Sequence, residues 1–181
     1  MNDKPLRVLA CIGLAVGGAL GLAGSFTPSS SLRGLAWGID GVALVMAGAL
    51  LAVLFFRRGQ DIVAAGFLVF AVGEGLILSG AAMGLAASVP SFGSGTGLWA
   101  MALALISGPC VFPIIVRWLG FAAAILFAIT ATQIFAGTEL TPLSRPLPFF
   151  AYPVFVATFV GWIWTLLKSD SPQNSERRRA E

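Results

Sequence analysis

Two acidic side chains lie within long apolar segments, and they are the residues best placed to do chemistry. Glu74 interrupts an apolar run of more than twenty residues, and Asp40 lies inside the preceding apolar run. A charged side chain at the centre of a lipid bilayer costs roughly 2.5–3.5 kcal/mol by insertion scales, so such residues are rare and often functional. A pair of acids in this setting can bind a cation, relay a proton or hold a polar solute.

The sequence predicts that these two acids lie at the same depth. Asp40 precedes the turn Arg57-Arg58-Gly59 by 17 positions, and Glu74 follows Arg58 by 16. If the flanking segments form an antiparallel helical hairpin, both acids stand about 24–26 Å above the turn, at 1.5 Å per residue. Two carboxylates close together in a low dielectric cannot both ionise cheaply, so we expect a nearby pair to share a proton.

Polar residues of two further segments are expected at a similar level. Counting from the ends of their apolar runs places Tyr152, Thr130 and Gln133 near the depth of the acids. We therefore predict a polar layer that is the one candidate functional site in the sequence. Its members are Asp40, Glu74, Thr130, Gln133 and Tyr152.

Equal depth does not establish contact, and two alternatives stay open. Asp40 and Glu74 can face different neighbours and form only hydrogen bonds between helices. Alternatively, one of them can pair with Arg33 or Arg145, which flank apolar runs at the opposite side from the Arg57 turn.

The residues that are missing exclude several kinds of site. The chain has no histidine and two cysteines, Cys11 and Cys110, which are far apart in sequence. Histidine-ligated haem, zinc sites and Ser-His or Cys-His nucleophiles are therefore excluded within the chain. We predict no metal, no cofactor and no enzymatic activity. The net charge of +3 does not indicate nucleic acid, because the basic residues flank apolar runs.

The composition is that of an integral membrane protein. Of 181 residues, 57% are hydrophobic and 10% are charged, against about 25% charged in soluble domains. The lipid bilayer is therefore the expected partner, and we predict an all-α polytopic protein with six transmembrane helices. The expected spans are about 6–26, 33–56, 60–86, 94–107, 113–136 and 147–167, with an uncharged loop at 88–97 and a charged, disordered tail at 169–181.

The distribution of basic residues predicts the orientation. With six spans, both termini lie on one side, together with nine of the eleven Lys and Arg residues. The basic side faces the cytoplasm by the positive-inside rule. We therefore expect both termini in the cytoplasm and the protein in a bacterial inner membrane.

Glycines recur on predicted helix faces, where they let two helices approach closely. The four-residue spacing of Gly13, Gly17 and Gly21 suits packing within the chain or a homo-oligomer contact. The glycines predicted to serve helix packing are Gly13, Gly17, Gly21, Gly73, Gly75, Gly80 and Gly84.

Two classes of function fit these features. The acids and the glycine-rich helices favour a protein that moves a small solute or ion. The short loops and the absence of a soluble domain fit equally well a structural or assembly subunit of a larger membrane complex. A binder of a lipid-like cofactor is a further variant of this second class.

Overall fold

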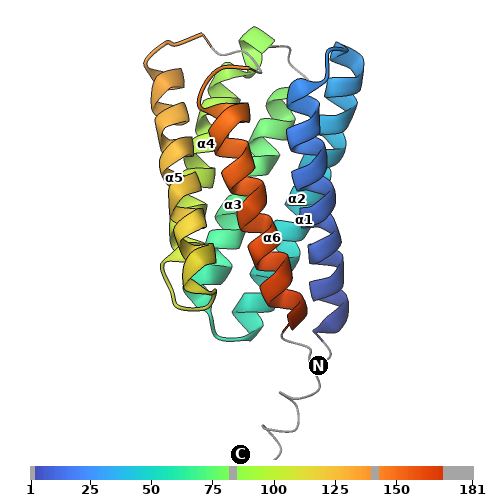
Figure 1. Ribbon diagram of the computed structural model, residues 1–181, viewed down its shortest axis with the longest axis vertical. Helices are drawn as coiled ribbons and strands as arrows, with labels where there is room; N and C mark the ends of the chain where they lie inside the picture. The colour runs from blue at the N-terminus through green and yellow to red at the C-terminus, as the bar shows by residue number, and fades with distance from the viewer. Residues whose placement is uncertain (1–2, 82–84, 140–142, 169–181) are drawn as a thin grey trace, which may run out of the picture.

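The computed structural model describes residues 3–81, 85–139 and 143–168, and these residues form helices and no strand. Six helices among them are long and apolar enough to cross a membrane, as Figure 1 shows. This confirms the predicted all-α membrane fold. The elements are α1 (Lys4–Phe26), α2 (Ser30–Arg57), α3 (Asp61–Ala81), α4 (Leu85–Ser107), α5 (Ile114–Phe135), the π-helical turn η1 (Leu147–Ala151) and α6 (Tyr152–Lys168).

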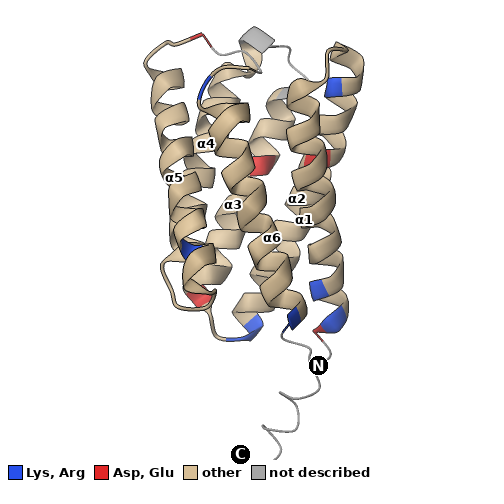
Figure 2. Ribbon diagram, viewed as in Figure 1, with Lys and Arg blue, Asp and Glu red and all other residues tan. Residues whose placement is uncertain are grey.

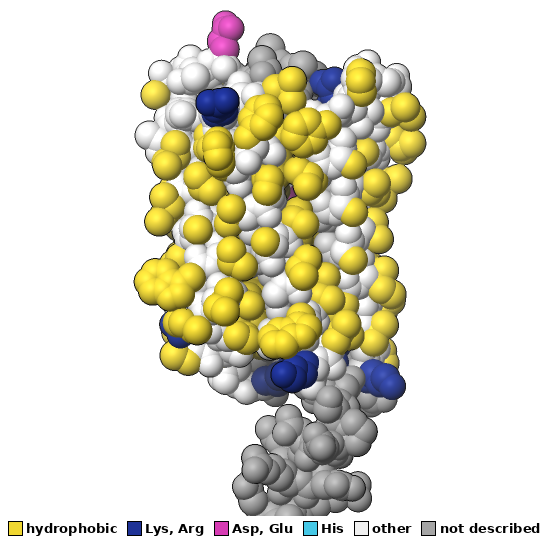
Figure 3. All heavy atoms as spheres, viewed as in Figure 1, with side chains coloured by type: hydrophobic (Ala, Val, Ile, Leu, Met, Phe, Trp, Pro, Cys, Tyr) yellow, Lys and Arg dark blue, Asp and Glu magenta, His cyan; other side chains and the backbone are white. Residues whose placement is uncertain are grey.

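The outer surface of the bundle is apolar, as lipid contact requires. Large side chains such as Ile115, Phe56 and Trp118 are about two-thirds exposed, and Figure 3 shows hydrophobic side chains over the whole visible side of the bundle. Contiguous apolar surface of this extent is unusual in a soluble monomer and indicates a membrane environment.

Basic residues gather at one end of the bundle, as Figure 2 shows. This end, called the basic end below, contains the first turn of α1, the α2–α3 turn, the first turn of α5 and the last turn of α6. There Arg58 forms an ion pair with Asp3 at 3.5 Å. The opposite end, called the far end, contains Arg33 and Arg145.

The helices form a closed ring around an aromatic core. Each helix lies against the next along the chain, and α6 closes the ring by packing against α1 and α5. Across the centre, α6 meets α3 through rings: Trp162 stands edge-on to Phe67 at 5.0 Å, and Phe155 to Phe70 at 5.8 Å between centroids. Aromatic side chains therefore fill the space between α3 and α6.

The glycine row of α1 packs on α2 of the same chain. A Cβ at Gly13 would lie 2.7 Å from the carbonyl oxygen of Ala43, and one at Gly17 would overlap Leu44. The face that suited either internal packing or a homo-oligomer contact is thus covered by α2. Gly80 packs in the same way on α4, where its Cβ would lie 2.7 Å from that of Ser91. The predicted roles of Gly84 and of the tail at 169–181 lie outside the described residues.

The fourth helix begins earlier than the sequence pattern indicated. Residues 88–97 form no loop, because α4 is helical from Leu85 and includes Pro90. Proline and glycine are tolerated in membrane helices when neighbouring helices cover them. Here Gly93 packs on Ile134 of α5, and Gly95 packs on Ile77 of α3. Gly93 and Gly95, two of the residues that suggested a loop, are therefore contacts between helices.

The end of α4 is capped by an arginine from the next helix. Arg117 donates from Nε to the carbonyl oxygen of Ser107 at 2.8 Å and from Nη2 to that of Gly108 at 2.6 Å. The last carbonyl groups of a helix lack partners within it, and a cation there also interacts favourably with the helix dipole. This arginine thereby fixes the short turn between α4 and α5.

Arg117→Met is expected to lower the free energy of unfolding by about 1.5–3 kcal/mol, because the hydrogen bonds that it removes come from a charged group. Reversible unfolding in mixed micelles measures the change. Arg57→Met is the matched control, since Arg57 is exposed and has no side-chain partner among the described residues. Equal losses in the two variants would contradict a capping role for Arg117.

Candidate functional site

Asp40 lies on the side of α2 that faces the glycine row of α1. A Cβ at Gly21 would lie 2.7 Å from Oδ2 of Asp40, and one at Gly17 would lie 3.2 Å from Oδ1. The two glycines therefore leave the room that the carboxyl group occupies. Oδ1 of Asp40 is buried without a hydrogen-bond partner in the described part of the protein.

Glu74 projects from α3 toward α2 and α4. Its side chain is 2% exposed, and Oε1 lies 3.3 Å from where a Cβ would stand on Gly41. The indole of Trp99 lies beside the carboxyl group of Glu74. Asp40 interacts electrostatically with the same carboxyl group. Neither Oε2 of Glu74 nor Nε1 of Trp99 has a partner at hydrogen-bond geometry within the described residues. Glu74 is thus a deeply buried acid whose polar atoms are incompletely satisfied.

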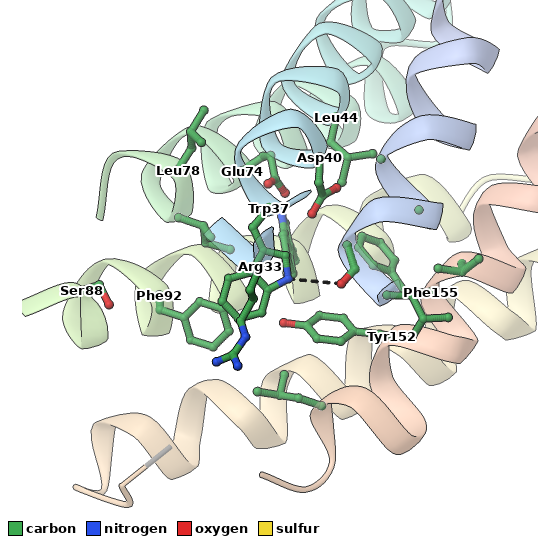
Figure 4. Close-up of a pocket in the computed structure, with 18 of the residues that line it drawn as sticks. Arg33, Trp37, Asp40, Leu44, Glu74, Leu78, Ser88, Phe92, Tyr152 and Phe155 are labelled. Atoms are coloured by element: carbon green, nitrogen blue, oxygen red, sulfur yellow. Dashed lines mark hydrogen bonds between the residues drawn. The ribbon is translucent and has the colours of Figure 1, made fainter. Parts of the chain in front are cut away.

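Both acids line one cavity of about 390 Å³ inside the bundle. Figure 4 shows the carboxyl groups of Asp40 and Glu74 next to each other, with the rings of Trp37 and Tyr152 nearby. All six helices contribute to the lining, most of which is apolar. The aromatic and aliphatic lining residues are Leu22, Trp37, Leu44, Ile77, Leu78, Val89, Phe92, Trp99, Ile134, Leu147, Tyr152, Phe155, Val156 and Phe159.

The cavity runs from the middle of the bundle to the far end. Ser30 and Arg33 in the first turn of α2 line it, as does Ser88 near the start of α4. Phe155 and Phe159 of α6 line it at the other side, where the aromatic core begins. The cavity therefore lies in the half of the bundle nearer the far end, and the aromatic core closes it toward the basic end.

No arginine neutralises the acids in the described structure. Arg33 donates to the carbonyl oxygens of Thr27, at 3.0 and 3.1 Å, and Pro28, at 3.3 Å, and its guanidinium lies 6.0 Å from the ring centroid of Trp37. Arg145 lies over Phe149 instead. The structure therefore contradicts the alternative in which one of these arginines pairs with an acid.

The five residues of the predicted polar layer do not all meet. Tyr152 lines the cavity with the two acids, whereas Thr130 and Gln133 of α5 do not. Thr130 is buried and donates to the carbonyl oxygen of Leu126 at 3.0 Å in its own helix. Depth along the chain therefore selected the right level for Tyr152, whereas Thr130 and Gln133 do not reach the cavity.

Three lining residues were not assigned to the site from the sequence. Nε1 of Trp37 donates to the carbonyl oxygen of Gly21 at 3.3 Å inside the bundle. Trp99 is buried next to Glu74, and Arg33 lines the cavity near the far end. The spacing of Arg33, Trp37 and Asp40 at i, i+4 and i+7 places them on one helix face, which is the signal that identifies them.

The two glycines that flank Glu74 have different surroundings. A Cβ at Gly73 would lie 2.9 Å from Cβ of Leu98 and 3.1 Å from the carbonyl oxygen of Gly95, both on α4. A Cβ at Gly75 would meet nothing within 4 Å. Only Gly73 therefore brings α4 close to the acid.

Gly73→Ala is expected to be less stable than Gly75→Ala by about 1–3 kcal/mol, because overpacking forces α4 to shift. Both substitutions gain the same helix propensity, so the gain cancels in the comparison. Thermal unfolding in detergent, followed by cysteine-reactive fluorescence, measures the difference. Two alanine variants of equal stability would show that α3 and α4 are not in close contact here.

Comparisons with known proteins identify no family for this chain. The sequence matches no protein-family model, no curated protein and no solved structure. The functional argument therefore depends on the cavity and its acids.

Proposed function

We propose that this protein moves a small solute or ion across the membrane, with Asp40 and Glu74 as the pair that holds it. The observation that carries the proposal is the pair of acids without a neutralising cation in one cavity within the spanning region. Ionisable residues inside a membrane bundle often mark solute, ion and proton pathways. Purely structural hydrogen bonds between helices would leave fewer of these polar atoms without partners.

The proposal includes an orientation and a location. The basic end is placed in the cytoplasm by the positive-inside rule, so the cavity faces the outer side of a bacterial inner membrane. A solute would then reach the acids from outside.

Passage to the basic end requires the aromatic core to rearrange. Phe155, Phe159 and Trp162 are nearly fully buried below the acids. Their rings contact one another and the rings of α3. Alternating access, in which a helix or group of helices rocks around a central site, provides such a rearrangement in many transporters. The helix that carries all three rings, α6, is the one whose movement would open the path.

Proton flux in proteoliposomes tests the proposal. A potential is imposed with potassium and valinomycin, and pyranine inside the vesicles reports the pH. We expect flux above that of protein-free vesicles in the parent and a return to that background in Glu74→Gln. Glu139→Gln is the matched control, because this exposed glutamate lies in the loop after α5 and does not line the cavity. Flux equal to background in the parent, or unchanged in Glu74→Gln, would contradict the proposal for the proton, the simplest ion that a pair of acids can carry.

A second candidate function is binding of a lipid-like cofactor, and the apolar lining of the cavity favours it. Extraction of the purified protein with organic solvent, followed by mass spectrometry, distinguishes the two functions. A stoichiometric apolar compound, retained in Glu74→Gln, would support the cofactor function.

A further inference from the structure

The shape and lining of the cavity carry information about the solute that the acids alone do not. At about 30 Å³ per water molecule, the cavity of about 390 Å³ has room for an organic molecule as well as a single ion. Its volume falls within the range of roughly 300–1,000 Å³ that is usual for small-molecule sites. The site is therefore much larger than an inorganic ion requires.

The polar groups are also too few for a metal ion. Among the described residues no group of three or more His, Cys, Asp or Glu side chains converges. Calcium and magnesium are held by six or more oxygen ligands, whereas this cavity offers two carboxyl groups among mostly apolar walls. Such a combination suits a ligand with one compact charge and a large apolar body.

Aromatic rings surround the acids on several sides. Trp37, Phe92, Trp99 and Tyr152 line the same cavity and come from three different helices. The faces of such rings attract organic cations, and the attraction is stronger in a desolvated site. Carboxyl groups beside aromatic faces are complementary to an organic cation and less so to a neutral or anionic compound.

The cavity extends to the contact between α1 and α6, where Gly18, Leu22 and Val156 line it. Figure 3 shows acidic atoms through a small gap between apolar side chains, on the side where α6 and α1 lie in front in Figure 1. Leu22 of α1 and Val156 of α6 line the cavity and are partly exposed.

We propose that the cavity binds amphipathic organic cations, with the charge at Asp40 and Glu74 and the apolar body against the aromatic walls. The inference rests on the proposed function, because it takes the two acids as the residues that hold the solute. The guanidinium of Arg33 is the one cation among the described lining residues, and it repels such a ligand.

Equilibrium binding of radiolabelled methyltriphenylphosphonium to the full-length protein in lipid nanodiscs tests this inference. We expect saturable binding that weakens at least tenfold in Glu74→Gln and in Asp40→Asn. Glu139→Gln is expected to bind like the parent, and Arg33→Gln is expected to bind as tightly or several-fold more tightly. Thermal unfolding of each variant confirms that it is folded.

Two competitors separate the contributions of charge and apolar body. Neutral triphenylphosphine oxide and the small cation tetramethylammonium are each expected to compete at least tenfold more weakly than unlabelled methyltriphenylphosphonium. Competition by the neutral compound at equal strength would overturn the role of the acids. Equal competition by tetramethylammonium would overturn the role of the aromatic walls.

The binding experiment and the flux experiment can have opposite outcomes, so together they distinguish the organic-cation inference from the transport proposal. Absence of saturable binding, with proton flux that still depends on Glu74, would overturn the organic-cation inference and leave the transport proposal standing. Binding that depends on both acids, in a protein without proton flux, would support the cation site and contradict proton movement by the acid pair.

Discussion

Trp162→Ala is expected to lower the free energy of unfolding by about 3–5 kcal/mol, the range for truncating a large aromatic side chain in a packed core. Trp162 is 1% exposed and contacts the rings of Phe67, Phe112 and Phe159. No other described side chain is placed to fill the space that it leaves at the centre of the ring of helices. The loss should appear as a lower midpoint in a reversible unfolding titration.

Trp164→Ala is the matched control. This tryptophan lies two positions further along α6, is 55% exposed and faces outward, with its ring against Lys168. Its truncation removes contact with lipid or detergent rather than with the core, so we expect a loss several-fold smaller than for Trp162. Similar losses in the two variants would show that the aromatic core does not hold α6 against α3.

Neutralising both acids is expected to lower the rate of flux hardly more than neutralising one. Each single variant, Asp40→Asn or Glu74→Gln, should lower the rate of flux by about 10²-fold or more, the usual contribution of a positioned proton-transfer group. If the two carboxyl groups act as one unit, the first change already destroys the site, and the losses are not additive. The double variant should therefore retain nearly the same residual rate as the single ones.

Initial rates of pyranine-reported flux for the four proteins measure this coupling. Asp61→Asn combined with Glu139→Gln is the control, because it removes the same two groups at exposed positions. Losses that multiply in the Asp40 and Glu74 double variant would indicate that the two acids serve separate sites.

The sequence predicts the level of the site because helical rise is constant. The α2–α3 turn lies nearly midway between Asp40 and Glu74, so an antiparallel hairpin must bring the two acids to similar depth. Which way a residue faces depends on helix rotation, and the packing of neighbouring helices sets it. The sequence therefore could not separate Tyr152, which lines the cavity, from Thr130 and Gln133, which do not.

The prediction of a loop at 88–97 was wrong for a related reason. Pro90 and the glycines that follow it break helices in water, but in the bundle Gly93 lies against α5 and Gly95 against α3. Sequence patterns do not show which neighbour will cover such residues. The same holds for Gly73 and Gly75, since only the first contacts another helix.

The glycine row of α1 connects the packing of the bundle with its site. Larger residues at Gly17 and Gly21 would occupy the space of the Asp40 carboxyl group. The small residues that let α1 approach α2 therefore also keep the acid inside the cavity. In this way one sequence feature serves both helix association and the placement of charge.

Labelling with dicyclohexylcarbodiimide, read by mass spectrometry of the intact chain and of its peptides, tests most directly whether the two acids form one site. The reagent is apolar and adds to protonated carboxyl groups. If Asp40 and Glu74 share a proton and one cavity, each chain should take up one adduct, on either acid, and that adduct should block the other. Chains that carry adducts on both Asp40 and Glu74, formed at independent rates, would contradict the account.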